Sequence, residues 1–192
     1  SGVARETGVD SPYNPGQQAM EQSAVHELIL GGARSGKSAY AEAQAAESGL
    51  AVSMVVTAQA GDGEMAARIE RHRANRPAHW PVVEAPLHLA AALREAAAED
   101  CFIVVDCLTL WLSNLLMDMD DAPGAPLPGL FVRERAALVD TLPMLPGRIA
   151  LVSNEVGSGV VPMGRLSRVF VDEAGRLHQA LARLCPRVTL VT

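Results

Sequence analysis

The segment GGARSGKS, residues 31–38, matches the phosphate-binding motif G-x-x-x-x-G-K-[ST] at every specified position. Residues 27–30 before it predict a short buried strand, and the alanine-rich residues 38–47 after it predict a helix. In a strand–loop–helix of this kind, backbone N–H groups and the positive end of the helix bind phosphate oxygens. A glycine-rich turn formed by chance would explain the motif but not its flanks. We therefore predict a nucleoside triphosphate site formed by Gly31, Gly32, Ala33, Arg34, Ser35, Gly36, Lys37 and Ser38.

Two residues of this motif have specific chemical roles in such sites. Lys37 is expected to reach the outer phosphates, and the Ser38 hydroxyl is expected to bind Mg²⁺. Asp106, which closes the apolar run of residues 102–105, could hold the same ion from the opposite side. Aspartate is also a favoured N-cap, so Asp106 could instead cap a helix that begins at Cys107. The presence of the phosphate loop favours the metal role.

His72 lies in residues 64–74, where the spacing of apolar residues predicts a helix. The segment around it is basic, which indicates a small anionic ligand or, alternatively, a solvated arginine face. Neighbouring cations favour the neutral imidazole, which could attack a phosphorus atom and carry a covalent nucleotide. A half-buried histidine near a helix C-terminus would have the same spacing, and geometry alone favours that structural role. The basic residues are Arg68, Arg71, Arg73 and Arg76.

Polar residues also follow other expected strands, at residues 51–56 and 149–152. Because ligands of open α/β sheets gather at the carboxyl ends of the strands, these residues predict one site shared with the phosphate loop. They are Thr57, Ala58, Gln59, Asn154 and Glu155.

Glu84 ends another short expected strand, residues 80–84. A carboxylate can accept two N–H bonds from the guanine edge, although a surface glutamate is the simpler interpretation of this residue alone. The N-K-x-D guanine signature is absent from the sequence, which disfavours a signalling GTPase.

The composition excludes several other classes of protein. The formal net charge is −6, whereas nucleic-acid binding requires a broad basic surface, so we expect no nucleic-acid partner. No apolar run approaches the roughly 20 residues that cross a bilayer, so we expect no membrane span. Three cysteines without a C-x-x-C pair indicate reduced thiols and a cytoplasmic protein.

Strand-like and helix-like segments alternate from residue 26 onward, which predicts an α/β, mostly parallel sheet with helices on both faces. Residues 1–24, rich in Gly, Pro, Ser and Gln, predict a disordered extension, and residues 25–192 are expected to form a single domain. The further expected helices are residues 87–98, 107–117, 131–142 and 165–184, and the last expected strand is residues 187–191.

With these residues assembled, the sequence resembles the bifunctional adenosylcobinamide kinase / adenosylcobinamide-phosphate guanylyltransferase family of cobalamin biosynthesis. The phosphate loop is common to many nucleotide-binding proteins, whereas EMAARI-x-x-H-R and NEVG-x-G-x-VP are specific to this family. The matching blocks are GGARSGKS (31–38), DGEMAARIERHRANRPAHW (62–80), VVDCLTLWLSNLL (104–116), NEVGSGVVP (154–162) and GRLHQALA (175–182).

The resemblance implies a RecA-like P-loop NTPase fold, commonly a homotrimer, and two reactions. ATP or GTP phosphorylates the hydroxyl of the aminopropanol arm of adenosylcobinamide. GTP then transfers GMP to an enzyme histidine, and the cobinamide phosphate takes up that GMP to give adenosylcobinamide-GDP. His72 matches this histidine, so the resemblance favours the catalytic role. The implied GTP contacts are loop 31–38, Thr57, Ala58, Gln59, Arg73, Ala74, Asn75, Arg76, Glu84 and Asp106.

Two other functions fit the same residues. The protein could be a plain P-loop small-molecule kinase in which His72 is structural, or a nucleotide-binding module without turnover. Covalent labelling of the protein by GTP distinguishes both from the two-step transferase.

Overall fold

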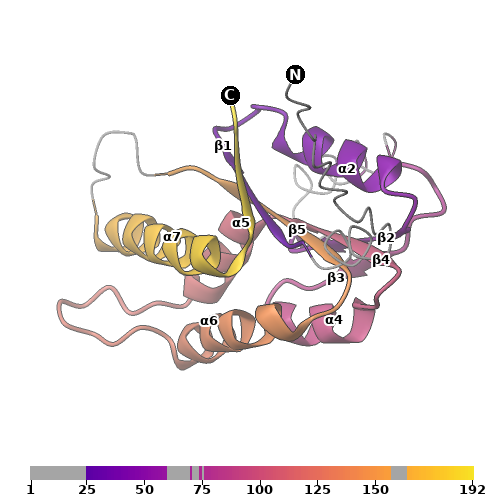
Figure 1. Cartoon of the computed structure of the whole chain (residues 1–192). Coiled ribbons are helices and arrows are strands. Elements are labelled where there is room, and N and C mark those ends of the chain that lie inside the picture. The colour runs from indigo at the N-terminus through magenta and orange to yellow at the C-terminus, as the bar shows by residue number, and fades with distance from the viewer. Residues whose placement is uncertain (1–24, 60–69, 71–73, 75, 157–163) are drawn as a thin grey trace, which may run out of the picture.

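The computed structural model describes residues 25–59, 70, 74, 76–156 and 164–192 (Figure 1). The segment expected to be disordered, residues 1–24, lies outside the described residues, as does most of the helix expected over residues 64–74. His72, Arg73 and Asn75 are among the residues outside the description. Glu70 and Ala74 are described, and both are helical.

The described residues form a six-stranded sheet in the order β3-β2-β4-β5-β1-β6, and every neighbouring pair of strands is parallel. Strand β5 lies between β1, which leads into the phosphate loop, and β4, which ends at Asp106. The expected α/β, RecA-like P-loop fold is therefore confirmed. The strands are β1 (Glu27–Gly31), β2 (Ala51–Val56), β3 (Val82–Glu84), β4 (Cys101–Asp106), β5 (Arg148–Asn154) and β6 (Arg187–Val191).

Successive residues of the central strands enter hydrophobic clusters on opposite faces of the sheet. Leu28 and Ile103 pack in one cluster, while their chain neighbours Ile29 and Val104 pack in the other. Side chains alternate across a strand, so a sheet buried on both faces needs apolar residues at consecutive positions. This requirement explains the uninterrupted apolar runs in the sequence.

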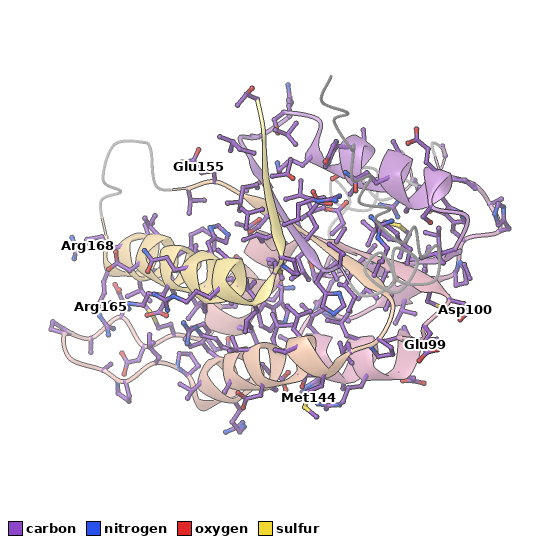
Figure 2. All side chains as sticks on the ribbon, in the orientation of Figure 1. Glu99, Asp100, Met144, Glu155, Arg165 and Arg168 are labelled. Atoms are coloured by element: carbon purple, nitrogen blue, oxygen red, sulfur yellow. The ribbon has the colours of Figure 1, made fainter. Side chains whose placement is uncertain are left out.

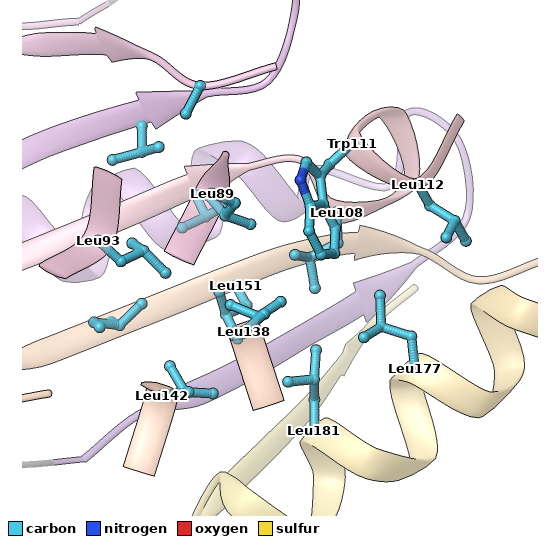
Figure 3. Packing of buried hydrophobic residues seen from close by; sticks show 14 of the residues in the cluster. Leu89, Leu93, Leu108, Trp111, Leu112, Leu138, Leu142, Leu151, Leu177 and Leu181 are labelled. Carbon is cyan, nitrogen blue, oxygen red and sulfur yellow. The ribbon is translucent and has the colours of Figure 1, made fainter. Parts of the chain in front are cut away.

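Helices lie on both faces of the sheet (Figure 1). Helix α2 (Lys37–Glu47) covers one face, where Ala41 and Ala45 are fully buried. The other face packs against α4 (Leu89–Ala96), α5 (Leu108–Leu116), α6 (Gly129–Thr141) with the short 3-10 turn η1 (Leu142–Met144), and α7 (Arg165–Leu184). Figure 3 shows the leucines of these helices meeting around Trp111, which is fully buried.

Within the described residues, the other expected strands and helices are present with small shifts at their ends, while the helix expected over residues 64–74 stays a prediction. Strand β3 begins at Val82 rather than at residue 80, because Trp80 packs in the cluster beneath α2 instead of joining the sheet. The expectation that Asp106 could cap the following helix is wrong: Asp106 is the last residue of β4, and Cys107 is the N-cap of α5. None of the helices in the described ranges is long and apolar enough to cross a membrane.

Candidate active site

The phosphate loop joins β1 to α2, and its backbone explains why two of its glycines are required. Gly36 has φ 93°, in the left-handed region, directly before the first residue of α2. A Cβ on Gly31 would lie 2.5 Å from Ser35 Oγ and 2.6 Å from the Val191 carbonyl oxygen, closer than such atoms pack. Gly36 therefore serves the backbone conformation, whereas Gly31 provides space between the loop and β6.

The side chains of the loop place polar atoms in its interior. Lys37 is only 7% exposed, and its Nζ donates a hydrogen bond of 2.8 Å to the carbonyl oxygen of Gly32. Ser35 Oγ is buried without a hydrogen-bond partner in the described part of the chain. A buried hydroxyl of this kind costs free energy unless it is satisfied. Phosphate oxygens entering the loop would provide that partner.

Ser38 and Asp106 are in contact although 68 residues separate them in the sequence. The Ser38 hydroxyl, in the first turn of α2, donates to Asp106 Oδ2 at 3.3 Å. Strand β4 ends directly beneath α2, which explains why the two residues meet. A hydroxyl and a carboxylate beside a phosphate loop form the donor set that holds Mg²⁺ in nucleotide sites.

Arg76 links the same carboxylate to α2. Its Nε donates to Glu42 Oε1 at 2.7 Å, and its Nη2 lies 3.6 Å from Asp106 Oδ2. The Arg76 side chain is 6% exposed, so both ion pairs are largely shielded from water. One guanidinium therefore joins the residues that surround the expected metal position.

The register of the sheet aligns the remaining strand ends. Val56 of β2 is opposite Asp106 on one side and opposite Glu84 on the other, while Gly31 is opposite Asn154. The expected convergence of strand ends on one rim is thus observed for the described residues. Glu84 is exposed, at the outer edge of the sheet.

Thr57, Ala58 and Gln59 continue the chain beyond β2. Thr57 is fully buried, Ala58 is buried and Gln59 is exposed. The Thr57 hydroxyl accepts a bond of 3.1 Å from the Cys107 N–H and donates one of 2.7 Å to the Cys107 carbonyl oxygen. Thr57 thus connects β2 to the residue that follows Asp106.

Asn154 and Glu155 lie at the end of β5, beside the phosphate loop. The Asn154 N–H donates to Thr109 Oγ1 at 3.2 Å, and the Glu155 N–H donates to the Gly31 carbonyl oxygen at 2.9 Å. Figure 2 shows the exposed Glu155 side chain beyond the end of the sheet. These bonds attach the β5 end to β1 and to α5.

Two other histidines, neither of them part of the phosphate loop, occupy partly or fully buried positions. His178 of α7 lies 2.7 Å from Ser153 Oγ, and burial lowers its pKa, an effect that the charge of Glu155 opposes. His26 is 5% exposed, its Nε2 lies 3.0 Å from the Leu145 carbonyl oxygen, and burial lowers its pKa as well. Burial and these contacts within the fold indicate a structural role for both.

The structure also identifies residues of the site that sequence reasoning missed: Glu42, Thr109 and Asn114. Glu42 lies one helical turn beyond Ser38, so the amphipathic pattern of α2 provided the only signal for it. Thr109, Ser113 and Asn114 interrupt an otherwise apolar helix sequence, LTLWLSNLL, and of the three only Ser113 is exposed. Polar residues on a buried helix face are the signal that could have identified them.

Comparisons with known proteins agree with this geometry. Residues 27–192 match the model of a family described as cobinamide kinase / cobinamide phosphate guanyltransferase. The bifunctional adenosylcobalamin biosynthesis protein CobP of Pseudomonas aeruginosa is 62% identical over 165 residues, which cover 86% of this chain and 91% of that protein. The bifunctional adenosylcobalamin biosynthesis proteins CobU of Escherichia coli and Salmonella typhimurium are each 39% identical over 170 residues, covering 85% of this chain and 93% of theirs. With its phosphate loop, its Ser38–Asp106 contact and these matches, the chain belongs to the cobinamide kinase / cobinamide phosphate guanyltransferase family.

Proposed function

We propose that the protein phosphorylates adenosylcobinamide and then transfers GMP from GTP to the product through His72. The family combines a kinase and a guanyltransferase, so the protein is a transferase. The observation that carries the proposal is the Ser38–Asp106 contact beside the buried Lys37. It brings a phosphate loop and a carboxylate together as Mg²⁺-dependent transfer of a phosphoryl or nucleotidyl group requires.

In the kinase step, the loop of residues 31–38 binds the triphosphate, and Lys37 neutralises charge on its outer phosphates. The described residues contain no cluster of three or more His, Cys, Asp or Glu side chains able to hold a metal by themselves. Ser38 and Asp106 would instead hold Mg²⁺ together with phosphate oxygens of the substrate. When bound, the ion stabilises the charge that develops on the transferring group.

In the guanylyl step, a lone pair on the His72 imidazole forms a bond to the α-phosphorus of GTP. The bond from that phosphorus to the bridging oxygen breaks, and pyrophosphate leaves. A phosphate oxygen of adenosylcobinamide phosphate then attacks the same phosphorus. The phosphorus–nitrogen bond breaks, its electron pair returns to the nitrogen, adenosylcobinamide-GDP forms and the neutral imidazole is restored.

The chain supports this role for His72 through its neighbour Arg76. Arg76 contacts Asp106, and four residues of extended chain reach at most about 14 Å. The proposal requires His72 to approach the phosphates from this segment. Arg73, Ala74, Asn75 and Arg76 supply the proposed contacts to the nucleotide from this segment, and Ala74 is exposed.

Thr57, Ala58, Gln59 and Glu84 form the proposed nucleotide contacts on the other side of Asp106. Glu84 would accept hydrogen bonds from N1–H and the 2-amino group of guanine. Register supports this placement, because Glu84 and Asp106 lie on either side of Val56.

We further propose a cytoplasmic homotrimer, as the family resemblance implies. Strand β6 is an edge strand that exposes 48% of Val188 and 61% of Leu190, and exposed apolar edges are usually covered. Sedimentation equilibrium of the purified protein tests the oligomeric state. A mass equal to one chain at micromolar concentration would contradict the trimer.

Incubation with GTP labelled at the α-phosphorus tests the two-step mechanism. The expected result is label on the protein that survives alkali, is lost in acid and is abolished in His72→Ala. His79→Ala is the matched control, because His79 is exposed in the same stretch of chain and should label normally. Phosphorylation of adenosylcobinamide should persist in His72→Ala.

Two results would favour the alternative functions. If the protein phosphorylates adenosylcobinamide but acquires no covalent label, it is a plain small-molecule kinase. If the protein binds nucleotide but catalyses neither reaction, it is a nucleotide-binding module. Normal formation of adenosylcobinamide-GDP by His72→Ala would exclude the covalent route.

A further inference from the structure

Polar side chains of helix α5 connect the carboxyl ends of three strands, β2, β3 and β5. The Asn114 side-chain nitrogen donates to the Thr57 carbonyl oxygen at 2.9 Å and to the Pro86 carbonyl oxygen at 3.1 Å. The Thr109 hydroxyl oxygen accepts a hydrogen bond from the Asn154 N–H. Asn114 thereby joins the segment after β2 to the segment after β3. Thr109 connects the end of β5 to the same helix.

Strand β3 depends on such connections because it is short and lies at the edge of the sheet. It has three residues, and among the described strands it pairs with β2 alone, with Val82, Val83 and Glu84 opposite Met54, Val55 and Val56. An edge strand of this length has few ladder bonds to hold it in position. The chain immediately after Glu84 is therefore what determines where the Glu84 carboxylate lies.

Three hydrogen bonds hold that following chain. The Ala85 N–H donates to the Val56 carbonyl oxygen at 2.8 Å, and the Trp111 indole N–H donates to the Leu87 carbonyl oxygen at 2.8 Å. Asn114 binds the carbonyl oxygen of Pro86, which lies between these two residues. Trp111 is a fully buried core residue (Figure 3). Asn114 is half-buried, and its side-chain nitrogen is bonded to the Thr57 and Pro86 carbonyl oxygens.

We propose that Asn114 is a positioning residue for recognition of the base. By holding the Pro86 and Thr57 carbonyl groups together, its amide keeps the Glu84 carboxylate where it can accept both N–H groups of the guanine edge. This inference rests on the proposed function, in which Glu84 binds guanine.

The chemistry of the asparagine side chain suits this role. Its single nitrogen carries two hydrogens, which allow it to bind two carbonyl groups from different strands. Aspartate has nearly the same shape but no donor, and alanine removes the group entirely. Glu84 and Asp106 lie two strand spacings apart, roughly 10 Å, which one nucleoside triphosphate can span from base to phosphates.

The test compares GTP with inosine triphosphate, which lacks the 2-amino group. Dissociation constants of both nucleotides are measured by calorimetry on the full-length protein. A hydrogen bond to a carboxylate changes affinity by about tenfold or more, so wild type should prefer GTP by that factor. Asn114→Ala and Asn114→Asp should bring the ratio of the two constants close to one. Ser113→Ala, an exposed neighbour on α5, should keep the wild-type ratio.

The ratio remains informative even if a variant is partly unfolded, because both nucleotides are measured on the same sample. An Asn114 variant that keeps the full preference for GTP would overturn the inference. Glu84→Gln is the companion variant that tests the base contact itself. If Glu84→Gln lowers the ratio and Asn114→Ala does not, the proposed function survives and only the role of Asn114 is wrong.

A double variant separates positioning from a general structural role. If Asn114 acts through Glu84, adding Asn114→Ala to Glu84→Gln should cause no further loss of preference. Independent, additive losses would overturn the inference. An unchanged ratio in Glu84→Gln alone would exclude both the guanine contact and the role of Asn114 that depends on it.

Discussion

The Arg76 guanidinium lies 3.6 Å from Oδ2 of Asp106, the same oxygen that receives the Ser38 hydroxyl. A cation bound between Ser38 and Asp106 would have to share the Asp106 carboxylate with Arg76 or displace the Arg76 guanidinium from it. The positive charge of Arg76 therefore opposes binding of a free divalent ion while favouring binding of a nucleotide. The two effects have opposite signs and can be measured separately.

Arg76→Gln should raise the affinity of the nucleotide-free protein for Mn²⁺ and lower its affinity for Mg·GTP. Loss of a unit charge close to the ion should change the Mn²⁺ dissociation constant by at least about fivefold, even with strong screening. Electron paramagnetic resonance of free Mn²⁺ measures the first effect and calorimetry the second. Arg94→Gln is the control. Arg94 is an exposed residue of α4 whose side chain donates to the Thr141 hydroxyl of α6, so this variant also removes one positive charge but leaves Asp106 unaffected. Unchanged Mn²⁺ affinity would show that Arg76 does not compete for Asp106.

Lys37 is the only lysine in the chain, so any modification of a lysine side chain reports on this residue alone. An acyl-phosphate derivative of ATP, which transfers its acyl group to a nearby lysine, should modify Lys37, and excess GTP should block the modification. Mass spectrometry of the peptide containing residue 37 measures both. Lys37→Ala should reduce the rates of the two proposed transfer reactions, phosphorylation and guanylyl transfer, by about 100-fold, because it removes a donor to the phosphates. Labelling that GTP does not affect would place Lys37 outside the nucleotide site.

Gly31 and Gly32 are adjacent, but we expect alanine to destabilise the fold at Gly31 and to have little effect at Gly32. Gly31→Ala should destabilise the fold by about 1–3 kcal/mol, since its Cβ would meet Ser35 Oγ and the Val191 carbonyl oxygen. No atom lies within 4 Å of a Cβ placed on Gly32, so Gly32→Ala should change the free energy of unfolding by less than about 0.5 kcal/mol. Urea denaturation of both variants measures the difference. Equal losses would contradict the close packing of Gly31 against β6.

The buried histidines predict a loss of stability in mild acid. Burial lowers the pKa of His26 and of His178 in the folded protein, so the unfolded chain binds more protons once the pH falls below about 6.5. The free energy of unfolding should therefore decrease from pH 7.5 to pH 5.5. It should decrease less in His26→Gln combined with His178→Gln, because those variants have no imidazole to protonate at either position. Parallel pH profiles for wild type and the double variant, measured by urea denaturation, would contradict the assignment.

Local sequence was sufficient to predict the phosphate loop and the α/β class. The residues of the loop are consecutive, and the conformation of Gly36 and the placement of Lys37 depend mainly on their junction between β1 and α2. The apolar run before Asp106 likewise predicted a strand buried on both faces, and β4 confirms it. The family resemblance rested on such blocks, and the comparisons confirm it.

Contacts between distant parts of the chain were not predictable in the same way. Arg76 was expected to contact nucleotide, but no spacing in the sequence indicated that it also binds Glu42 of α2. The contacts of Asn114 with Thr57 and Pro86 likewise depend on how α5 packs against the sheet. The role of His72 and the oligomeric state stay predictions.

The sequence by itself determined which groups are available: a glycine-lined loop with one lysine, a carboxylate that ends a buried strand, and a histidine among arginines. Only the tertiary structure decided which of them meet. Parallel pairing brought the ends of β2, β3 and β4 into one row, and the packing of α2 over β4 brought Ser38 to Asp106. The physical reason is that local motifs depend on backbone geometry within a few residues, whereas hydrogen bonds across 57 or 68 positions exist only after the core has packed.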